Sequence, residues 1–388
     1  MKWTGVIITA CLAGVVGCDS TTPSWQGAEP LRVHFASRSW NVGNDVGREL
    51  TSKHYRIYTT SSRPEILDYL PGFMEAAHRN YLDITGLQAK PPAQTYPVYM
   101  MGTRQEWAGL TQSIVGGQWS MYASISAGGY CYKGVCVFWD IGGLSSMSVA
   151  SHEGLHQLLH YRMKDNLPMW MEEGLATLCE GYEINGPTVR FTPERNVARF
   201  TDLRKAIIND WWIPLEKLLV MDGGDAVRLG APERTVGYYG QIWALAVFLK
   251  TDPQFSPGRG KLLADAEAGR LIAALSKTDQ QLARQLTGTR SYNRQVALPL
   301  FKLYISKDKQ GFERRYKAFA KKLVRLQQAA TTPPNQNNFS RWSQKTPRKD
   351  GFPASSPAFS TPSVRVETPV IATEPISATR RSFQHGSG

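Results

Sequence analysis

The sequence contains few cysteines, and none of its five cysteines has the spacing of a zinc finger. It also lacks the aromatic signature of the common RNA-binding modules. Basic residues nevertheless outnumber acidic residues by 45 to 32, which gives a formal net charge of +13. Such a charge favours anionic partners, namely lipid headgroups, cell-wall polymers or nucleic acid. Because both nucleic-acid signatures are absent, we expect no nucleic-acid partner.

The cysteines that are present differ in their expected roles. Cys11 lies in an apolar run at the amino terminus and should be removed with that run. Cys131 and Cys136 bracket four residues, so in an exported protein they would either close a hairpin as a disulfide or remain thiols. Cys179 is expected to be a small, buried apolar residue.

The amino terminus has the pattern of an export signal. Residues 1–17 combine an early lysine with an apolar core that is short for a membrane span. The run ends in V-V-G-C, which resembles a bacterial lipobox, a motif whose cysteine (here Cys18) is acylated. We therefore predict an exported lipoprotein anchored to a membrane, with simple secretion as the alternative. Residues 18–50 are predicted to be a tether and a lead-in to the fold.

Hydrophobic patterning predicts an α+β fold, in which a small mixed β-sheet packs on one central helix and a mainly helical part follows. Strands are expected at 54–60, at 96–101 and in the β-rich stretch 116–140, which turns at Lys133-Gly134. Helices are expected at 63–84, from Thr103, at 146–163, 169–182, 196–209 and 214–221, from Tyr238, and through most of 279–328, with a break at Gly223-Gly224. From Thr331 onward Pro, Ser, Thr and Asn dominate, so 331–388 is predicted to be a disordered tail.

The central helix contains a complete H-E-x-x-H motif, formed by His152, Glu153 and His156. Residues four apart lie on one face of a helix, so the two imidazoles can be directed at one point. Two neutral imidazoles suit Zn²⁺. Glu153 follows the first histidine directly and is placed to take a proton from an activated water molecule.

A catalytic zinc site needs a third protein ligand. The metzincin pattern would require a glycine and a histidine after the motif, and those positions hold Leu159 and Arg162. The remaining source is a glutamate of the following helix, W-M-E-E-G-L-A, with another glutamate further on. Glu173 and Glu180 are two helical turns apart and share a face, whereas Glu172 points about 100° away from Glu173.

The pairing of H-E-G-L-H with W-M-E-E-G-L-A-x-x-x-E resembles the gluzincin metallopeptidases. A closer likeness is to an uncharacterised family of secreted bacterial gluzincin-like proteins, which shares the H-E-x-x-H-Q start, the P-x-W-x-x-E-G-L-A helix and a later Y-x-Q-x-W-A-L helix. This likeness covers roughly residues 96–249. Compared with the aminopeptidase branch, the spacer is a few residues shorter, and no G-A-M-E-N-like segment is present for a substrate amino terminus, which argues against aminopeptidase activity.

The resemblance implies a ligand set and a domain. The glutamate before the glycine, Glu173, would be the third zinc ligand, and Glu180 would orient a ligand histidine. One Zn²⁺ per chain is therefore expected, in a metallopeptidase domain at 51–250 that is followed by a helical part at 251–330. The strand before the H-E-x-x-H helix would form one wall of the cleft and pair with an extended peptide.

A zinc peptidase also needs a donor for the oxyanion of its reaction intermediate. No histidine lies between the Glu173 helix and the tail, because the seven histidines are His34, His54, His78, His152, His156, His160 and His385. Tyr239 matches the tyrosine of the Y-x-Q motif in the similar family, so we predict it as the donor, with Tyr238 as the alternative. Both tyrosines also fit an apolar core helix, and His160 fits a solvated helix end better than a place in the site.

The segment 301–325 is strongly basic, with nine Lys or Arg residues against two acidic residues. Such a helix would either rest on anionic headgroups or simply present a solvated face. Together these features predict an exported, membrane-tethered zinc peptidase that hydrolyses peptide bonds by means of a metal-activated water. The alternatives are a catalytically inactive gluzincin-like binding lipoprotein and an envelope protein whose basic segments carry its function.

Overall fold

The computed structural model describes residues 27–42, 45–91, 94–123, 125, 128–228, 232–278 and 289–330. The predicted signal segment 1–17, the predicted acylation site Cys18 and the predicted tail 331–388 lie outside these residues, as do residues 279–288 of the predicted helical stretch. Within the described part the fold is α+β, as the sequence predicts.

The larger of two sheets has six strands in the order β2-β3-β4-β5-β7-β6. It is mixed, because the pairs β4–β5 and β5–β7 are parallel and the other neighbours are antiparallel. The strands are β2 (Ala36–Val42), β3 (Asp45–Thr51), β4 (Tyr55–Thr59), β5 (Tyr96–Met101), β6 (Gly129–Tyr132) and β7 (Val135–Trp139). The predicted strands at 54–60 and 96–101 are thus confirmed, whereas β2 and β3 lie in the segment expected to lead into the fold.

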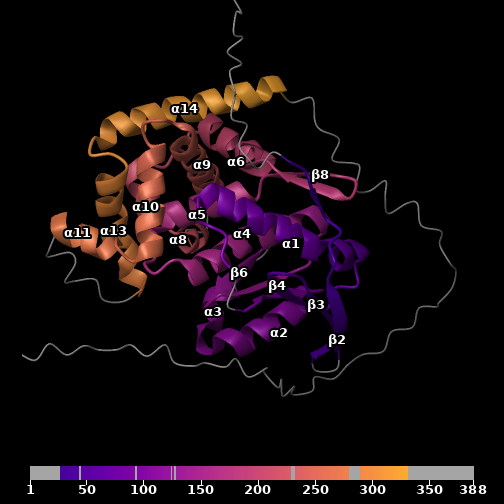
Figure 1. The fold of residues 1–388 in the computed structure, drawn as a ribbon. Coiled ribbons are helices and arrows are strands. Elements are labelled where there is room, and N and C mark those ends of the chain that lie inside the picture. Colours follow the sequence, from indigo (N-terminus) through magenta and orange to yellow (C-terminus); the bar gives the residue numbers. More distant parts are fainter. Residues whose placement is uncertain are drawn as a thin grey trace, which may run out of the picture.

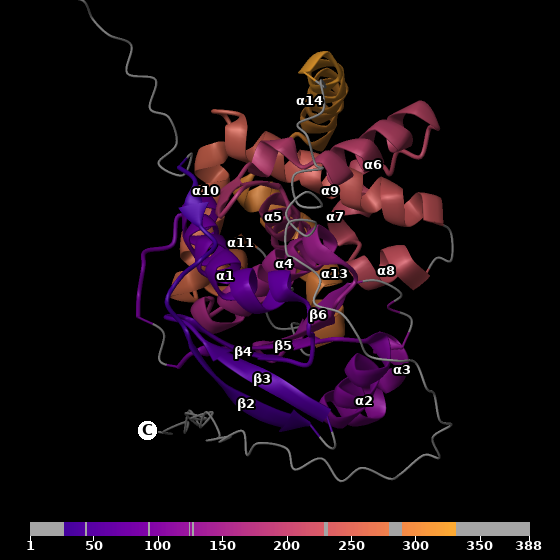
Figure 2. The same ribbon diagram turned by 90° about the vertical axis from the view of Figure 1, so that its right-hand side faces the viewer.

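Two long helices cover one face of this sheet, and they contact each other (Figures 1 and 2). They are α1 (Pro64–Thr85) and α4 (Gly143–Arg162), the helix that carries the H-E-x-x-H motif. The alternation of β4 directs Tyr55 and Ile57 into the core beneath them. A glycine permits the close approach, because a Cβ on Gly154 of α4 would lie 2.4 Å from the hydroxyl of Tyr81.

The opposite face carries a smaller core under α2 (Arg104–Val115), a 3₁₀ turn (Gly116–Gln118) and α3 (Trp119–Tyr122). Thr103 starts α2 through a capping box with Glu106, which satisfies backbone N–H groups at the helix start. The stretch 116–140, expected to be β-rich, is therefore helical at its beginning and forms a hairpin only at β6 and β7. The hairpin turns at Lys133-Gly134, as predicted.

The second layer is mainly helical and is built around α9 (Pro232–Thr251). This helix is apolar on most of its faces, which is typical of a helix inside a core. α5 (Met169–Cys179) and α6 (Val197–Ile208) pack against it. After α5 the chain forms β8 (Tyr182–Asn185) and β9 (Thr188–Phe191), and the amino-terminal strand β1 (Glu29–Pro30) pairs with β9 to complete a three-stranded sheet.

The remaining helices complete the helical part that the sequence predicts. They are α7 (Leu215–Val220), α8 (Gly223–Arg228), α10 (Ser256–Ala268), α11 (Leu271–Thr278), α13 (Thr289–Tyr304) and α14 (Lys309–Ala330). The glycines predicted to break the chain at 223–224 instead begin α8. One buried cluster extends from Leu31 to Val324, so the core is continuous across residue 250. Among the helices of the described part, none has the length and apolar composition needed to cross a membrane.

Candidate metal centre

The two motif histidines meet at one face of α4, near the middle of the molecule (Figure 1). Their Nε2 atoms lie 3.2 Å apart, and each side chain is largely buried. The i, i+4 spacing of His152 and His156 produces this pairing locally, because such residues are neighbours on a helix surface. Two imidazole nitrogens therefore converge on one point, as the sequence predicts.

The helix α5 brings a carboxylate to the same point. Glu173 Oε2 lies 3.6 Å from His152 Nε2, and the three candidate ligand atoms all lie within 4.8 Å of one another. The same oxygen is buried and has no hydrogen-bond partner. A buried, unpartnered carboxylate oxygen is costly unless a cation or a donor satisfies it. Within the described ranges, His152, His156 and Glu173 are the only group of this kind.

Carboxylates hold both imidazoles from behind. Glu180 Oε1 lies 2.8 Å from His152 Nδ1, and Glu172 Oε1 lies 2.8 Å from His156 Nδ1. A carboxylate accepts a hydrogen bond from Nδ1–H, which keeps the proton on Nδ1 and leaves the Nε2 lone pair free to bind a metal. The contact predicted for Glu180 is present. The contact of Glu172 is not predicted by the sequence, because helical periodicity within α5 does not show which side chain of another helix it meets.

An arginine of α6 fixes Glu180 in turn. The Nε and Nη2 atoms of Arg199 donate to the two oxygens of Glu180 at 2.7 and 2.9 Å, and its Nη1 donates to Asp202 at 3.0 Å. Asn196, which caps α6, also donates to Glu180 at 3.1 Å. Sequence reasoning missed Arg199 and Asn196, since nothing local in the sequence pairs them with a glutamate on another helix.

These contacts strongly shift the pKa values of Glu180 and His152. Burial raises the pKa of Glu180, but the charge of Arg199 and the hydrogen bonds outweigh it and lower that pKa to about 2. Burial lowers the pKa of His152, but Glu173 and Glu180 outweigh it and raise that pKa to about 10. The carboxylates therefore form an anionic shell, which attracts a proton or a metal cation to the imidazoles.

The predicted proton acceptor, Glu153, is buried on the same helix turn. Burial raises the pKa of its carboxyl, and the charges of His152 and His156 oppose that shift. A raised carboxyl pKa suits a general base that works near neutral pH. Its backbone is also held, because the thiol of Cys136 on β7 donates to the carbonyl oxygen of Glu153 at 3.2 Å.

The predicted oxyanion donor is close to the cluster as well. A Cβ placed on Gly223 would lie 2.8 Å from the Tyr239 hydroxyl and 3.4 Å from Glu173 Oε1, so both atoms flank this glycine. The guanidinium of Arg199 lies over the Tyr239 ring, 4.7 Å from its centroid. The alternative, Tyr238, is fully buried, and its hydroxyl has no hydrogen-bond partner. Tyr239 is partly exposed and is therefore the more accessible of the two.

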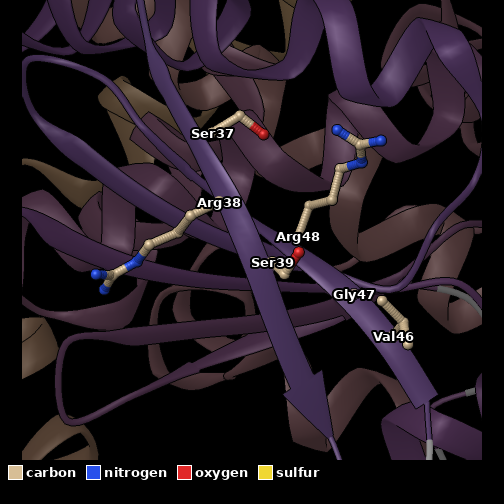
Figure 3. A pocket seen from close by; sticks show the side chains of 6 residues that line it. All are labelled: Ser37, Arg38, Ser39, Val46, Gly47 and Arg48. Carbon is tan, nitrogen blue, oxygen red and sulfur yellow. The ribbon is translucent and has the colours of Figure 1, made fainter.

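Other candidate residues lie outside the cluster. His160 is exposed and contacts the hairpin turn at Gly134. Cys131 and Cys136 face each other in register across β6 and β7, and both are free thiols. A hollow of about 370 Å³ lies on the outer hairpin, where Figure 3 shows Ser37, Ser39, Arg38 and Arg48 around Gly47 and Val46. This hollow contains none of the predicted site residues.

The donor set fits a metal ion. Two imidazole nitrogens and one carboxylate oxygen, with a carboxylate behind each imidazole, are ligands that Zn²⁺ accepts in catalytic sites. Comparison of the chain with models of known families, with curated proteins and with solved structures finds no match.

Proposed function

We propose that the protein is a zinc-dependent peptidase, exported and tethered to a membrane through acylated Cys18. One observation carries this proposal: two oriented imidazoles and a buried, unpartnered carboxylate oxygen converge beside Glu153. A purely structural metal site has no use for a general base. The presence of Glu153 therefore favours hydrolysis over the alternative of an inactive binding lipoprotein.

The ligands would be His152 Nε2, His156 Nε2 and Glu173. Bound there, Zn²⁺ supplies Lewis-acid chemistry that polarises a water molecule and the scissile carbonyl. Glu180 and Glu172 hold the imidazoles in the tautomer that this binding needs. The chain thus preorganises the site before metal arrives.

Glu153 would move the proton. Its carboxylate takes a proton from the attacking water and later returns it to the leaving amine. Burial beside two imidazoles keeps this carboxyl away from bulk water and raises its pKa. Such a proton transfer contributes typically a hundredfold to ten-thousandfold to the rate.

The hydroxyl of Tyr239 would donate a hydrogen bond to the oxyanion that develops on the substrate carbonyl. Burial raises the pKa of this tyrosine well above its usual value, so the hydroxyl stays protonated across the physiological range. The Arg199 guanidinium lies over the ring of Tyr239 and so restrains the orientation of that ring. The tyrosine is therefore a hydrogen-bond donor throughout the physiological pH range.

The substrate would bind along β6. In the described six-stranded sheet this strand lies at an edge, and it contacts α4. An extended peptide can add to such an edge through backbone hydrogen bonds. The gluzincin resemblance implies this role for the strand directly before the H-E-x-x-H helix, but that strand, β7, is paired on both sides, with β5 and β6, so the free edge belongs to its hairpin partner β6.

The first test is the metal content of the full chain, purified without chelators. One zinc per chain is expected, because the three donor atoms lie within 4.8 Å of one another. Glu173→Ala should remove most of this zinc, whereas Glu233→Ala, at an exposed position on α9, should keep it. Absence of zinc from the unaltered chain after zinc has been added back would refute the metal site.

The second test separates metal binding from catalysis. Glu153→Gln keeps the shape of the side chain but cannot accept the proton, so turnover of a peptide library should fall at least about a hundredfold. Zinc content should stay at the level of the unaltered chain. Zinc without turnover in either protein would favour the inactive binding lipoprotein, and full activity of Glu153→Gln would refute the role of Glu153.

A further inference from the structure

The helix α14 crosses one end of the molecule on its outside, as both ribbon views show (Figures 1 and 2). Its apolar residues, among them Phe312, Tyr316 and Ala320, are buried against the fold. Arg314, Lys321 and Arg325 are exposed and follow the spacing i, i+7, i+11, which places them along one line on the opposite side. We call these three residues the α14 stripe. At 1.5 Å per residue it is about 16 Å long.

The positive charge of the α14 stripe is not neutralised by any carboxylate in the described part of the chain. None of its three residues forms an ion pair with a described carboxylate. Neighbouring cations on the same helix are paired, because Arg315 contacts Asp252 and Lys317 contacts Glu313. The α14 stripe thus keeps an uncompensated positive charge directed away from the fold.

Nearby residues add to this charge. α6 packs against α14, and its Arg204 and Lys205 are exposed. The acidic residues of these two helices do not cancel it, because Asp202 is paired with Arg199 and Glu313 is paired with Lys317. The exposed sides of α6 and α14 therefore carry a net positive charge.

We propose that the α14 stripe is a docking surface for the anionic headgroups of a lipid bilayer. A straight line of exposed cations matches a flat anionic surface, and each cation near such a surface adds to binding. This proposal goes beyond the proposed peptidase activity and does not depend on it.

The course of the chain supports a bilayer as the occupant. The first described strand, β1, pairs with β9 and contacts α1, and in both views it lies on the same side of the six-stranded sheet as α14 (Figures 1 and 2). The predicted acylation site Cys18 is followed closely by Gly27, and the chain between them reaches at most about 30 Å. An anchor at Cys18 would therefore keep the helical side of the molecule, which includes α14, within reach of the headgroups.

The experiment is sedimentation of the full chain with vesicles, in a Cys18→Ser background that removes the predicted acylation site. Vesicles of phosphatidylcholine alone are compared with vesicles of phosphatidylcholine and phosphatidylglycerol. Binding should be stronger to the anionic vesicles, and this gain should vanish in high salt. The variant R314E/K321E/R325E should lose more than about a hundredfold in affinity for anionic vesicles, since each basic residue contributes roughly fivefold and each introduced glutamate is repelled.

A matched control reverses Arg48, Lys53 and Lys277, which are exposed on other parts of the fold. Both variants have the same net charge, so a loss confined to the α14 stripe variant supports docking through α14. Equal losses in the two variants, or equal binding of the unaltered chain to both kinds of vesicle, would overturn the proposal.

Two further measurements keep the outcome decisive. Thermal unfolding shows whether each variant folds, and R314Q/K321Q/R325Q replaces the reversal variant if that one does not. Duplex DNA and a sulfated polysaccharide are offered as soluble polyanions. Tighter binding of either one than of anionic vesicles, lost in the same variant, would assign the α14 stripe to a soluble polyanion instead.

Discussion

The metal centre and the α14 stripe use charge in opposite ways. In the centre the charged groups are buried, and His152, Glu180 and Arg199 are held next to one another by hydrogen bonds. On α14, Arg314, Lys321 and Arg325 are exposed and unpaired. Burying a charge is costly without a partner, whereas an exposed charge is solvated and adds only a small, salt-screened term. One substitution should therefore disable the centre, while the α14 stripe should lose its effect only gradually.

The largest effect of a single substitution is expected in the buried centre, at Tyr239. Tyr239→Phe removes the proposed donor and should lower kcat about a hundredfold to a thousandfold, with zinc content unchanged. Gly223→Ala should act in the same direction, because its Cβ would lie 2.8 Å from the Tyr239 hydroxyl and displace it. Steady-state kinetics and zinc analysis of both variants measure this.

The control is Gly260→Ala, where an added Cβ has nothing within 4 Å. It should leave kcat unaltered. Unchanged kcat in Tyr239→Phe would remove this tyrosine from the mechanism and direct attention to Tyr238.

The next effect concerns Arg199, which acts through Glu180 and not on the substrate. Losing such an outer partner typically weakens metal affinity about tenfold to a hundredfold. Arg199→Met should show this loss in a competition titration with a zinc chelator. Arg199→Lys keeps the charge but cannot form the two-pronged contact with Glu180, so it should fall in between.

Arg204→Met serves as the matched control, because Arg204 is exposed and lies more than one turn beyond Arg199 on α6. This variant should bind zinc as the unaltered chain does. Equal zinc affinity in Arg199→Met and Arg204→Met would show that the centre does not need this arginine, and the contrast between buried and exposed charge would weaken.

A smaller effect is expected at His78, which is buried away from the metal centre. Burial and then the charge of His54 lower its pKa from 6.5 to about 4, against the opposing charge of Glu75, while Arg162 and Lys53 act in the same direction as His54. The unfolded chain therefore protonates His78 more readily than the folded chain does. Stability from neutral His78 is complete above pH 6.5 and is lost as pH falls towards 4, by about 3 kcal/mol at most.

Urea unfolding across that pH range measures the effect. His78→Gln should flatten the pH dependence, whereas His34→Gln, at an exposed position, should not change it. An equal slope in all three proteins would place the acid sensitivity elsewhere.

The smallest effect is expected for one residue of the α14 stripe. Arg314→Gln should weaken binding to anionic vesicles only about fivefold, and Lys321→Gln should add a similar factor. Vesicle sedimentation of the two single variants and the double variant checks this additivity. A complete loss from one substitution would mean that the α14 stripe acts as a specific site, and the comparison with the buried centre would break.

Several features were predictable because they depend on short-range pattern. The alternation of Tyr55 and Ile57 predicted β4, and the i, i+4 spacing of His152 and His156 predicted their convergence. The strands β2 and β3 were not predicted, because polar residues and glycine interrupt the alternation of apolar residues in them. These strands form through their antiparallel pairing with each other, which the local sequence does not show. The same limit applies at Gly223, which packing makes part of a helix rather than a break.

By itself, the sequence determined the fold class, the face of α4 that carries the two histidines, and the candidate glutamates on the helix that follows. It did so because helical periodicity sets directions within a few turns. Only the tertiary structure decided that Glu172 contacts His156, that Arg199 holds Glu180, and that Gly223 brings Tyr239 beside Glu173. Those contacts join separate helices, and their geometry depends on how the helices pack around the buried core.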